Sequence, residues 1–298
     1  MGDVSERFWA KLPDGSRDAL VDRLSQSELQ SVLLDVTRER AAKVTPARLL
    51  QRWQQDRFVQ PSTIDPRELV QTQQRLWELL PEKFDGVQLS PVTPLGTCSA
   101  IATINQHQVV STIRGTEVAS DPTNELAIEA AVRRRAGQDR VHLAACQRVV
   151  RAQPFDGPGM SAHFELFVLV SSARDTGSCR TEAELLIDHL SFWHAVLGDK
   201  AELTFTAFTE SALRDRIEDT VRPALDVAFT EDAGRTASAN YYAGTALGIG
   251  LGGAGLGSGS AGLGDGGFTT WTADLLGDAK ERCLTSCIST ERLTAIGA

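Results

Sequence analysis

Two arginines in otherwise apolar segments are the residues of this sequence best suited to chemistry. Arg151 lies in RVVRAQ, which a turn joins to the strand-like HFELFVLV, and Arg292 lies in STERL near the last residue. A guanidinium is always charged and planar, and burying one is costly unless an acceptor or an anion pairs with it. The two arginines therefore predict an anion site, and the phosphate of a nucleotide is the anion we expect.

The surroundings of Arg151 leave two interpretations open. On a strand, Arg151 and Gln153 lie two positions apart and therefore on the same face. A cation beside an amide suits a phosphate and the edge of a purine. The alternative is an arginine on the exposed face of an antiparallel sheet, with no ligand at all.

Composition indicates a folded protein without a membrane anchor. The chain has 298 residues, of which 42% are hydrophobic and 23% charged, as in ordinary globular proteins. It contains no apolar run of about 18 residues, and MGDVSERFWAKLPDGSRD lacks the pattern of a secretory signal. We therefore expect a cytoplasmic protein with no membrane partner.

The charge balance argues against nucleic acid as a broad partner. The formal net charge is −9, which disfavours an extended electrostatic footprint on DNA or RNA. The triplet at 133–135, all arginine, is interpreted as the solvated end of a helix.

The cysteines and histidines predict neither disulfides nor a metal site. Five cysteines stand at wide intervals, and Cys283 and Cys287 are not accompanied by a second ligand pair. We expect reduced, buried side chains.

The chain divides into a helical N-terminal extension, residues 1–64, and a core, residues 65–298. Apolar residues recur every three or four positions in LVDRLSQSELQSVLLDV, in PARLLQRWQQDRF and in RELVQTQQRLWELL after Pro66. Strand and helix patterns then alternate along the core. QHQVVSTIRG predicts a strand, Asp121 caps a helix, VHLAACQRVVRAQ and HFELFVLVSS predict an antiparallel hairpin, and ELTFTAF follows a helix that ends at Gly198. The fold class is α+β, an antiparallel sheet flanked by helices.

A glycine-rich stretch interrupts the second half of the core. Residues 244–267 hold 12 of the 25 glycines, and we expect a mobile loop over 248–264. Gly250, Gly252 and Gly255 match G-x-G-x-x-G, but no strand and helix flank them in a way that favours dinucleotide binding.

Five segments in order resemble the catalytic core of class II aminoacyl-tRNA synthetases, and within them the histidyl-like branch. RLWELLPEKFDGVQLSPV is similar to the first motif, a dimer-forming helix and strand, with Pro91 as its proline. The second motif, Phe-Arg-x-Glu, is represented by residues 150–153, and STERL resembles the third. NYYAG at 240–244 resembles the histidine-binding segment, and GDGGFTTWTADLLG resembles the glycine pair before motif three. The resemblance covers about residues 65–295.

The resemblance implies roles for individual residues. Arg151 and Arg292 would be the catalytic residues, on the α- and γ-phosphates of ATP held with Mg²⁺. Gln153 would hold the adenine edge, and Glu291 would belong to the same nucleotide site. The remaining implied contacts are to the substrate: Arg114, Thr116 and Glu117 toward its amino group, and Tyr241, Tyr242 and Gly244 around its acyl part. Both guanidinium groups should then face one cavity on a shared sheet floor.

Several positions depart from the family pattern. Gln153 replaces a glutamate, and Leu166 stands where a glutamine is expected. Ser289 and Thr290 replace small glycines before the terminal Glu-Arg pair. Ala237 stands in place of an arginine, with Arg235 two residues away. Each change removes a polar contact to ATP or to substrate, or crowds the adenine.

Three functions remain open from the sequence. The chain ends at Ala298, six residues after Arg292, so we expect no anticodon-binding domain. The first hypothesis is an ATP-dependent, AMP-forming ligase that activates an amino acid or similar carboxylate as an adenylate for a non-tRNA acceptor such as a carrier protein. The second is a catalytically silent paralogue, a ligand-binding regulatory subunit of a partner enzyme. Either would form a homodimer through residues 68–91. The third makes residues 1–80 an interaction domain and the rest a scaffold, in which the tyrosines and Trp271 only pack and Asp265 is a turn residue.

Overall fold

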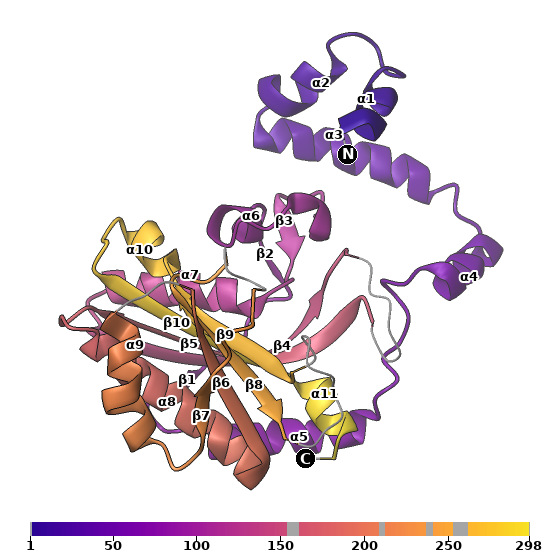
Figure 1. Ribbon diagram of the computed structural model, residues 1–298. Helices are drawn as coiled ribbons and strands as arrows, with labels where there is room; N and C mark the ends of the chain where they lie inside the picture. The colour runs from indigo at the N-terminus through magenta and orange to yellow at the C-terminus, as the bar shows by residue number, and fades with distance from the viewer. Residues whose placement is uncertain (1, 154–160, 209–211, 237–240, 253–261, 298) are drawn as a thin grey trace.

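The core is a sheet with helices on both faces, and a helical arm precedes it (Figure 1). The computed structural model describes residues 2–153, 161–208, 212–236, 241–252 and 262–297. The helices are α1 (Gly2–Trp9), α2 (Ser16–Asp18), α3 (Gln26–Ala41), α4 (Pro46–Gln55), α5 (Pro66–Leu79), α6 (Thr97–Ile101), α7 (Pro122–Arg135), α8 (Arg180–Leu197), α9 (Ala212–Arg216), α10 (Trp271–Leu276) and α11 (Thr290–Ala295). The strands are β1 (Asp85–Gly86), β2 (Val92–Pro94), β3 (Thr116–Val118), β4 (Arg140–Val150), β5 (His163–Arg174), β6 (Ala201–Ala207), β7 (Phe229–Glu231), β8 (Thr245–Leu251), β9 (Gly264–Thr269) and β10 (Glu281–Ser289).

Within the described ranges the main sheet has eight strands in the order β1-β4-β5-β10-β9-β8-β6-β7. The predicted hairpin is confirmed, since β4 and β5 pair antiparallel from Arg140 opposite Ala173 to Val150 opposite His163. Strand β10 inserts antiparallel between β5 and β9. The edge strands β1 and β7 each run parallel to their neighbour, which the sequence did not reveal. The α+β class with a mostly antiparallel sheet is thus confirmed.

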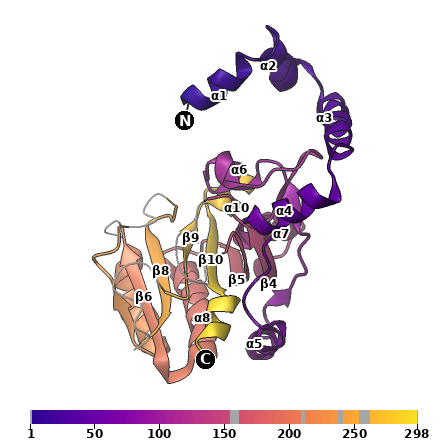
Figure 2. The same ribbon diagram turned by 90° about the vertical axis from the view of Figure 1, so that its right-hand side faces the viewer.

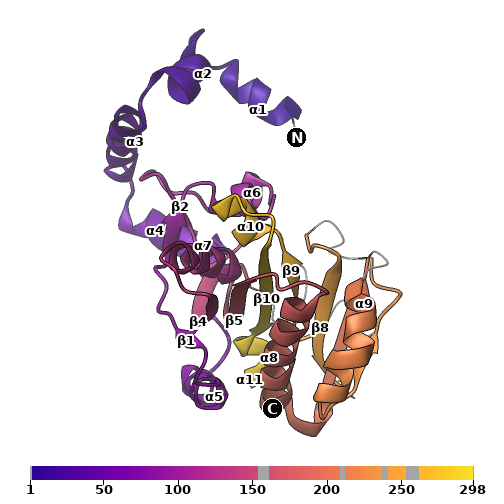
Figure 3. The same cartoon turned by 90° about the vertical axis from the view of Figure 1, so that its left-hand side faces the viewer.

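Alternating side chains supply each face of the sheet with its own apolar layer. Figure 3 shows the helices α7 and α8 that lie beside the sheet. Helix α7 packs on β4 and β5 and also contacts α10, so that Leu126 and Val168 belong to one buried cluster. On the other face α8 brings Phe192 and Trp193 against Phe167 of β5. Helix α5 contacts α8 and α11 on this second face.

A buried polar network fastens α8 to the sheet. The hydroxyl of Ser171 lies 2.7 Å from His142 Nδ1 and 2.8 Å from His189 Nε2. The Ser286 hydroxyl lies 2.8 Å from His189 Nδ1 and accepts a hydrogen bond from Trp193 Nε1 over the same distance. Burial lowers the pKa of both histidines, so the network is uncharged near neutral pH.

The N-terminal arm stands away from the sheet (Figures 1 and 2). None of the residues described in α1–α4 is buried, and large apolar side chains such as Leu49, Leu50 and Trp53 are exposed. The arm reaches the core at Gln26, whose amide lies against Gly115, and at Arg57, which donates to the carbonyls of Ala152 and Gln153. The arm helices are therefore held by local hydrogen bonds and caps rather than by a core of their own.

QHQVVSTIRG does not form the predicted strand. It contains a single turn of 3-10 helix, Gln106–Gln108, and two isolated bridges, from Val109 to Arg151 and from Ser111 to Glu117. The Thr112 hydroxyl then accepts from the backbone N–H of Arg114, which starts the turn into β3. Pairing in this segment is therefore confined to isolated bridges.

The arginine triplet is not a solvated helix end. Arg133 pairs with Asp85 at 2.7 Å, and Arg134 pairs with the buried Glu281 at 2.7 Å. Arg135 donates to the carbonyl of Leu275 over 3.2 Å. The prediction was wrong because the end of α7 reaches β10 and α10, contacts that only the tertiary structure creates.

The described parts of the glycine-rich stretch are strands rather than loop. Residues 245–251 form β8 and residues 264–269 form β9. A Cβ atom on Gly266 would lie 2.4 Å from the Thr285 carbonyl oxygen, so glycine permits the close pairing with β10. Residues 253–261, including Gly255, lie outside the described residues.

Candidate ligand site on the sheet

The carboxylate of Asp121 joins three segments that are distant in sequence. As the N-cap of α7, its Oδ1 accepts from the backbone N–H of Thr123 over 3.1 Å. Its Oδ2 accepts from the Tyr241 hydroxyl over 3.2 Å and lies 3.7 Å from Arg151 Nη2. The helix cap predicted from sequence is thus also the centre of a polar cluster.

Arg151 is fixed by the end of β4 and by the segment before α7. Its Nε donates to the Ser120 carbonyl over 2.8 Å, and its guanidinium lies 5.1 Å from the centre of the Phe164 ring. The side chain remains 28% exposed. A positioned and partly accessible guanidinium of this kind can accept an anionic group from solvent.

A second arginine–aspartate pair lies on β9. Arg235 contacts Asp265 at 3.1 Å and donates to the Leu247 carbonyl over 2.8 Å. The Tyr242 side chain also hydrogen-bonds Asp265. A Cβ atom on Gly267, whose φ is +156°, would meet the Tyr242 ring at 2.6 Å, so glycine makes room for the tyrosine.

The two tyrosines link these pairs. Their rings meet edge to face at 4.9 Å, and Tyr241 meets Trp271 in the same way at 5.5 Å. Burial, with the nearby aspartates, raises the pKa of both phenols well above its usual value. Both hydroxyls are therefore donors at neutral pH.

Cys287 lies beside the same cluster on β10. Its thiol lies 4.0 Å from Asp265 Oδ1. Burial first, and then the carboxylates of Asp265 and Asp121, raise the pKa of this thiol. The thiolate that nucleophilic catalysis requires is therefore suppressed.

Glu117, predicted to meet a substrate amino group, is fully buried. It accepts from the backbone N–H groups of Cys98 over 3.0 Å and Gly96 over 2.8 Å, and from Gln106 Nε2 over 2.8 Å. Burial alone would raise its pKa, but these donors together lower it. In this structure the carboxylate holds the start of α6, and a ligand would have to displace one of its donors.

Two further polar residues at the start of α7 lack partners. Burial, followed by the charges of Asp121 and Glu117, raises the pKa of Glu125 to about 7. Its Oε1, like both the amide nitrogen and the amide oxygen of the fully buried Asn124, has no hydrogen-bond partner among the described residues. Because buried polar groups are nearly always paired, this turn of α7 is suited to a ligand's polar groups.

The other residues that were predicted to bind the nucleotide form hydrogen bonds with the protein itself. Arg292 is exposed and donates to the Gly262 carbonyl over 3.1 Å. Glu291 accepts from Arg148 Nη2 over 2.7 Å and from Ser62 over 3.2 Å. The backbone carbonyl of Gln153 accepts from Arg57 over 2.8 Å.

No described contact brings the two predicted catalytic arginines together. Arg151 lies on the sheet face that α7 covers, whereas Arg292 belongs to α11, which packs on α5. The described contacts give them no common partner. One cavity facing both arginines therefore stays a prediction.

The other substrate residues are spread over two elements. Arg114 is exposed in the turn before β3, where the Thr116 hydroxyl lies 2.7 Å from that of Thr112. Gly244, with φ of +81°, offers its carbonyl to the backbone N–H of Phe208. Only the tyrosine pair among these predicted substrate residues joins Arg151 in the cluster around Asp121.

The positions that depart from the family pattern are filled by packing. Leu166 is buried in the apolar layer beneath α7. The hydroxyl of the fully buried Thr290 donates to Glu165 Oε1 over 2.9 Å. Position 237 lies outside the described residues.

Sequence reasoning missed the charge partners of this site. Asp121 was recognised only as a cap, and Asp265 only as a turn residue. Arg235 was treated as a displaced arginine. The sequence alone gives no sign that an aspartate lies beside an arginine and a tyrosine pair, because the three segments are distant in sequence and are brought together only by the sheet.

The described residues hold no evident metal centre. Among them, no group of three or more histidine, cysteine, aspartate or glutamate side chains gathers as ligands, and all five cysteines are free. No helix in the described parts of the chain has the length and apolar character to cross a membrane.

Comparison with known proteins identifies the fold. No protein-family profile and no curated protein matches the sequence. An ATP phosphoribosyltransferase regulatory subunit/histidyl-tRNA synthetase from Bacillus halodurans C superimposes with a TM-score of 0.58 at 11% identity, covering 80% of this chain and 82% of that one. A histidine–tRNA ligase subunit from Alicyclobacillus acidocaldarius has a TM-score of 0.58 at 12% identity, with coverage of 79% and 96%. Histidyl-tRNA synthetase from Nostoc sp. PCC 7120 superimposes with a TM-score of 0.58 at 13% identity, covering 81% of this chain and 74% of that one. The chain therefore has a class II aminoacyl-tRNA synthetase fold of the histidyl-tRNA synthetase type.

Proposed function

We propose that this protein is a synthetase-like regulatory subunit that binds a free amino acid at Arg151, Asp121 and Tyr241. The observation that supports this proposal most directly is a pair of opposite charges that lie side by side, Arg151 Nη2 and Asp121 Oδ2, 3.7 Å apart. A free amino acid carries the matching carboxylate and ammonium groups. Its carboxylate would pair with the exposed part of Arg151, and its ammonium would pair with Asp121.

The geometry of the pair supports a ligand between the two groups. Charge-assisted N–H···O bonds are usually about 2.7–2.9 Å long, so at 3.7 Å this pair is not saturated. The neighbouring Tyr241 hydroxyl offers a further polar group, and the orphan amide of Asn124 lies in the first turn of the same helix. An amino acid could use these contacts without breaking the cap of α7.

The same charges disfavour a triphosphate. Asp121, Asp265 and Glu117 bring negative charge to the cluster, so ATP would have to overcome repulsion from carboxylates that already have partners. The residues that replace the family's ATP contacts, Leu166 and Thr290, are committed to packing and to Glu165.

A partner protein fits the N-terminal arm. Helices α1–α4 contain no buried described residue and expose Leu49, Leu50 and Trp53. Apolar surface of this extent is typical of a protein–protein interaction site. One protein of the same fold is itself named a regulatory subunit of a phosphoribosyltransferase, which supports a regulatory role here as a proposal.

The test is a thermal-shift and calorimetric screen of the twenty amino acids, with ATP and Mg²⁺ measured separately. One amino acid, or a closely related group, should raise the melting temperature of the wild type. Arg151→Ala should abolish that shift, while the control Arg40→Ala, at an exposed arginine of α3, should retain it. If no amino acid binds, or if Arg151→Ala binds as well as the wild type, this function is wrong.

The second candidate is the AMP-forming ligase, and the exposed Arg292 favours it. This guanidinium could still reach a γ-phosphate, since its side-chain bond within the described residues is to a backbone carbonyl. Amino-acid-dependent exchange of pyrophosphate into ATP would support the ligase, with transfer to a carrier protein as the next step. Amino acid binding without exchange would support the regulatory subunit.

A further inference from the structure

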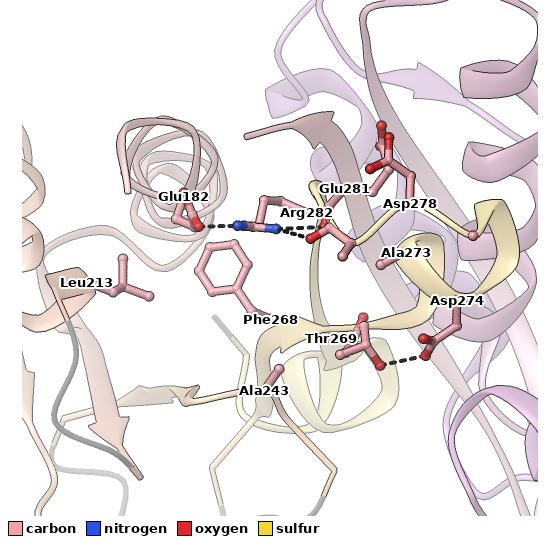
Figure 4. Close-up of a pocket in the computed structure, with 13 residues that line it drawn as sticks. Glu182, Leu213, Ala243, Phe268, Thr269, Ala273, Asp274, Asp278, Glu281 and Arg282 are labelled. Carbon is pink, nitrogen blue, oxygen red and sulfur yellow. Dashed lines mark hydrogen bonds and ion pairs between the residues drawn. The ribbon is translucent and has the colours of Figure 1, made fainter. Parts of the chain in front are cut away.

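A cavity of about 600 Å³ lies at the opposite end of β5 from Arg151. Figure 4 shows the residues that line it. Its walls come from the first turn of α8, from α10 and from the adjoining ends of β9 and β10. Phe268, Leu213 and Ala243 supply apolar surface, and Glu182 and Arg282 face one another across one side. This volume and this mixture of surfaces are typical of a small-molecule site.

Arg282 has little donor capacity left for an anionic ligand in this cavity. Its Nε donates to Glu182 Oε1 over 2.6 Å, and its Nη2 donates to Asp175 over 2.9 Å. Its Nη1 donates to the carbonyls of Ala279 and Glu281 over 3.0 and 3.1 Å. Four of the five N–H donors of the single arginine among the lining residues are therefore already engaged.

The Thr269 hydroxyl can donate or accept, and the remaining charged groups among the lining residues are carboxylates, which accept. Glu281 is held by Arg134 through bonds of 2.9 and 2.7 Å, and Asp278 is paired with Arg174. Glu182, however, is only 8% exposed, and its Oε2 has no partner among the described residues. A buried carboxylate oxygen without a donor is costly, and a ligand that donates a hydrogen bond would relieve that cost.

We infer that this cavity binds a small organic ammonium ion with a flat apolar body. The ammonium pairs with the Glu182 carboxylate, whose buried Oε2 must turn toward the cavity to accept from it, and the body lies against Phe268 and Leu213. Asp274, at the exposed rim, adds negative charge that attracts a cation. An anion would gain at most one N–H of Arg282 and would meet the charges of Glu182 and Asp274, so the site selects by charge.

This ligand site is separate from the proposed amino acid site. Arg151 follows β4 at the pair Val150–His163, whereas the cavity borders the pair Glu281–Arg174 at the far end of β5. The lining residue Ala243 lies two positions after Tyr241. The two sites share a segment but no side chain, so one proposal can fail without the other.

The experiment uses 2-phenylethylamine as the probe, with 2-phenylethanol and phenylacetate as its neutral and anionic counterparts. Calorimetry and saturation-transfer NMR on the full chain should show binding of the amine and at least about tenfold weaker binding of the other two compounds. Equal binding of the alcohol or of phenylacetate would overturn the inference, and this comparison needs no variant.

Variants locate the site. Glu182→Gln keeps the size of the side chain and an oxygen for Arg282 but removes the charge, and it should weaken amine binding by about tenfold or more. The matched control is Glu184→Gln, two residues along α8, where the side chain is 53% exposed and paired with Arg140. Arg151→Ala should also leave amine binding intact. Unchanged binding by a folded Glu182→Gln, or equal losses in the control, would place the amine elsewhere.

Discussion

The Tyr241 hydroxyl donates to Asp121 Oδ2 over 3.2 Å, and this bond joins the segment before β8 to the N-cap residue of α7. The same carboxylate lies 3.7 Å from Arg151. A single aspartate thus sets the relative positions of the helix, the tyrosine pair and the arginine that we expect to bind a ligand.

Replacing Tyr241 with phenylalanine should remove this bond and keep the ring contacts with Tyr242 and Trp271. We expect a loss of about 1–2 kcal/mol in the free energy of unfolding, because a buried bond to a charged acceptor is lost. Urea unfolding measures the change. In an Asp121→Asn background the same substitution should cost less, and an equal cost in both backgrounds would show that the bond contributes nothing.

Glu125 should make stability depend on pH. Its pKa is about 7 in the folded protein and near the usual value of 4.5 in the unfolded chain, so the folded state binds the extra proton between these values. The free energy of unfolding should therefore fall as pH rises from about 4.5 to 7, by up to about 3 kcal/mol for this group. Above pH 7 this contribution should stay constant.

Glu125→Gln should remove this dependence and stabilise the protein at pH 8 while changing little at pH 4. Unfolding curves of wild type and variant across the pH range give the difference directly. Glu129→Gln, one turn along α7 and paired with Arg133 at the surface, is the control. A difference between wild type and Glu125→Gln that does not vary with pH would contradict this assignment.

The ion pair between Arg134 and Glu281 should contribute strongly to stability. The two side chains are 10% and 4% exposed, and two bonds of 2.9 and 2.7 Å join them. Arg134→Ala should cost about 3–5 kcal/mol, because it leaves a buried carboxylate unpaired. The exposed pair between Arg38 and Asp35 offers the control, since Arg38→Ala should not shift the midpoint of thermal unfolding measurably.

Removal of residues 2–55 should leave the core folded. No described residue of α1–α4 is buried, so the truncated chain keeps both apolar layers of the sheet. We expect the same melting temperature within about 2 °C by circular dichroism. A fall of about 10 °C or more would show that the arm stabilises the core despite its exposure.

The homodimer through residues 68–91 remains a prediction. Helix α5 buries Leu69 and Leu76 but leaves Val70 58% exposed and Trp77 37% exposed. Val70→Asp should convert a dimer to a monomer in sedimentation equilibrium, because a charge would be buried at the contact. A wild type that is monomeric at micromolar concentration, or a variant that stays dimeric, would refute this interface.

The sequence determined the elements whose signals are local. Two apolar runs, VHLAACQRVV and HFELFVLV, separated by the turn-rich PFDGPGMSA, predicted the β4–β5 hairpin, because strands with a short connection pair antiparallel. Asp121 before Pro122 specified the start of α7, because a side-chain acceptor there satisfies the free N–H groups of the first turn. The ordered motifs also led to the class II synthetase fold.

Only the tertiary structure decided which charges meet. Asp121 lies 120 residues from Tyr241 and Glu182 lies 100 residues from Arg282, yet each pair is in contact because β10 is inserted between β5 and β9. The same insertion places Glu281 beside α7, so that Arg134 forms a buried ion pair where the sequence predicted a solvated helix end. Pairing across a sheet depends on strand order, and strand order is a property of the whole chain that no local spacing encodes.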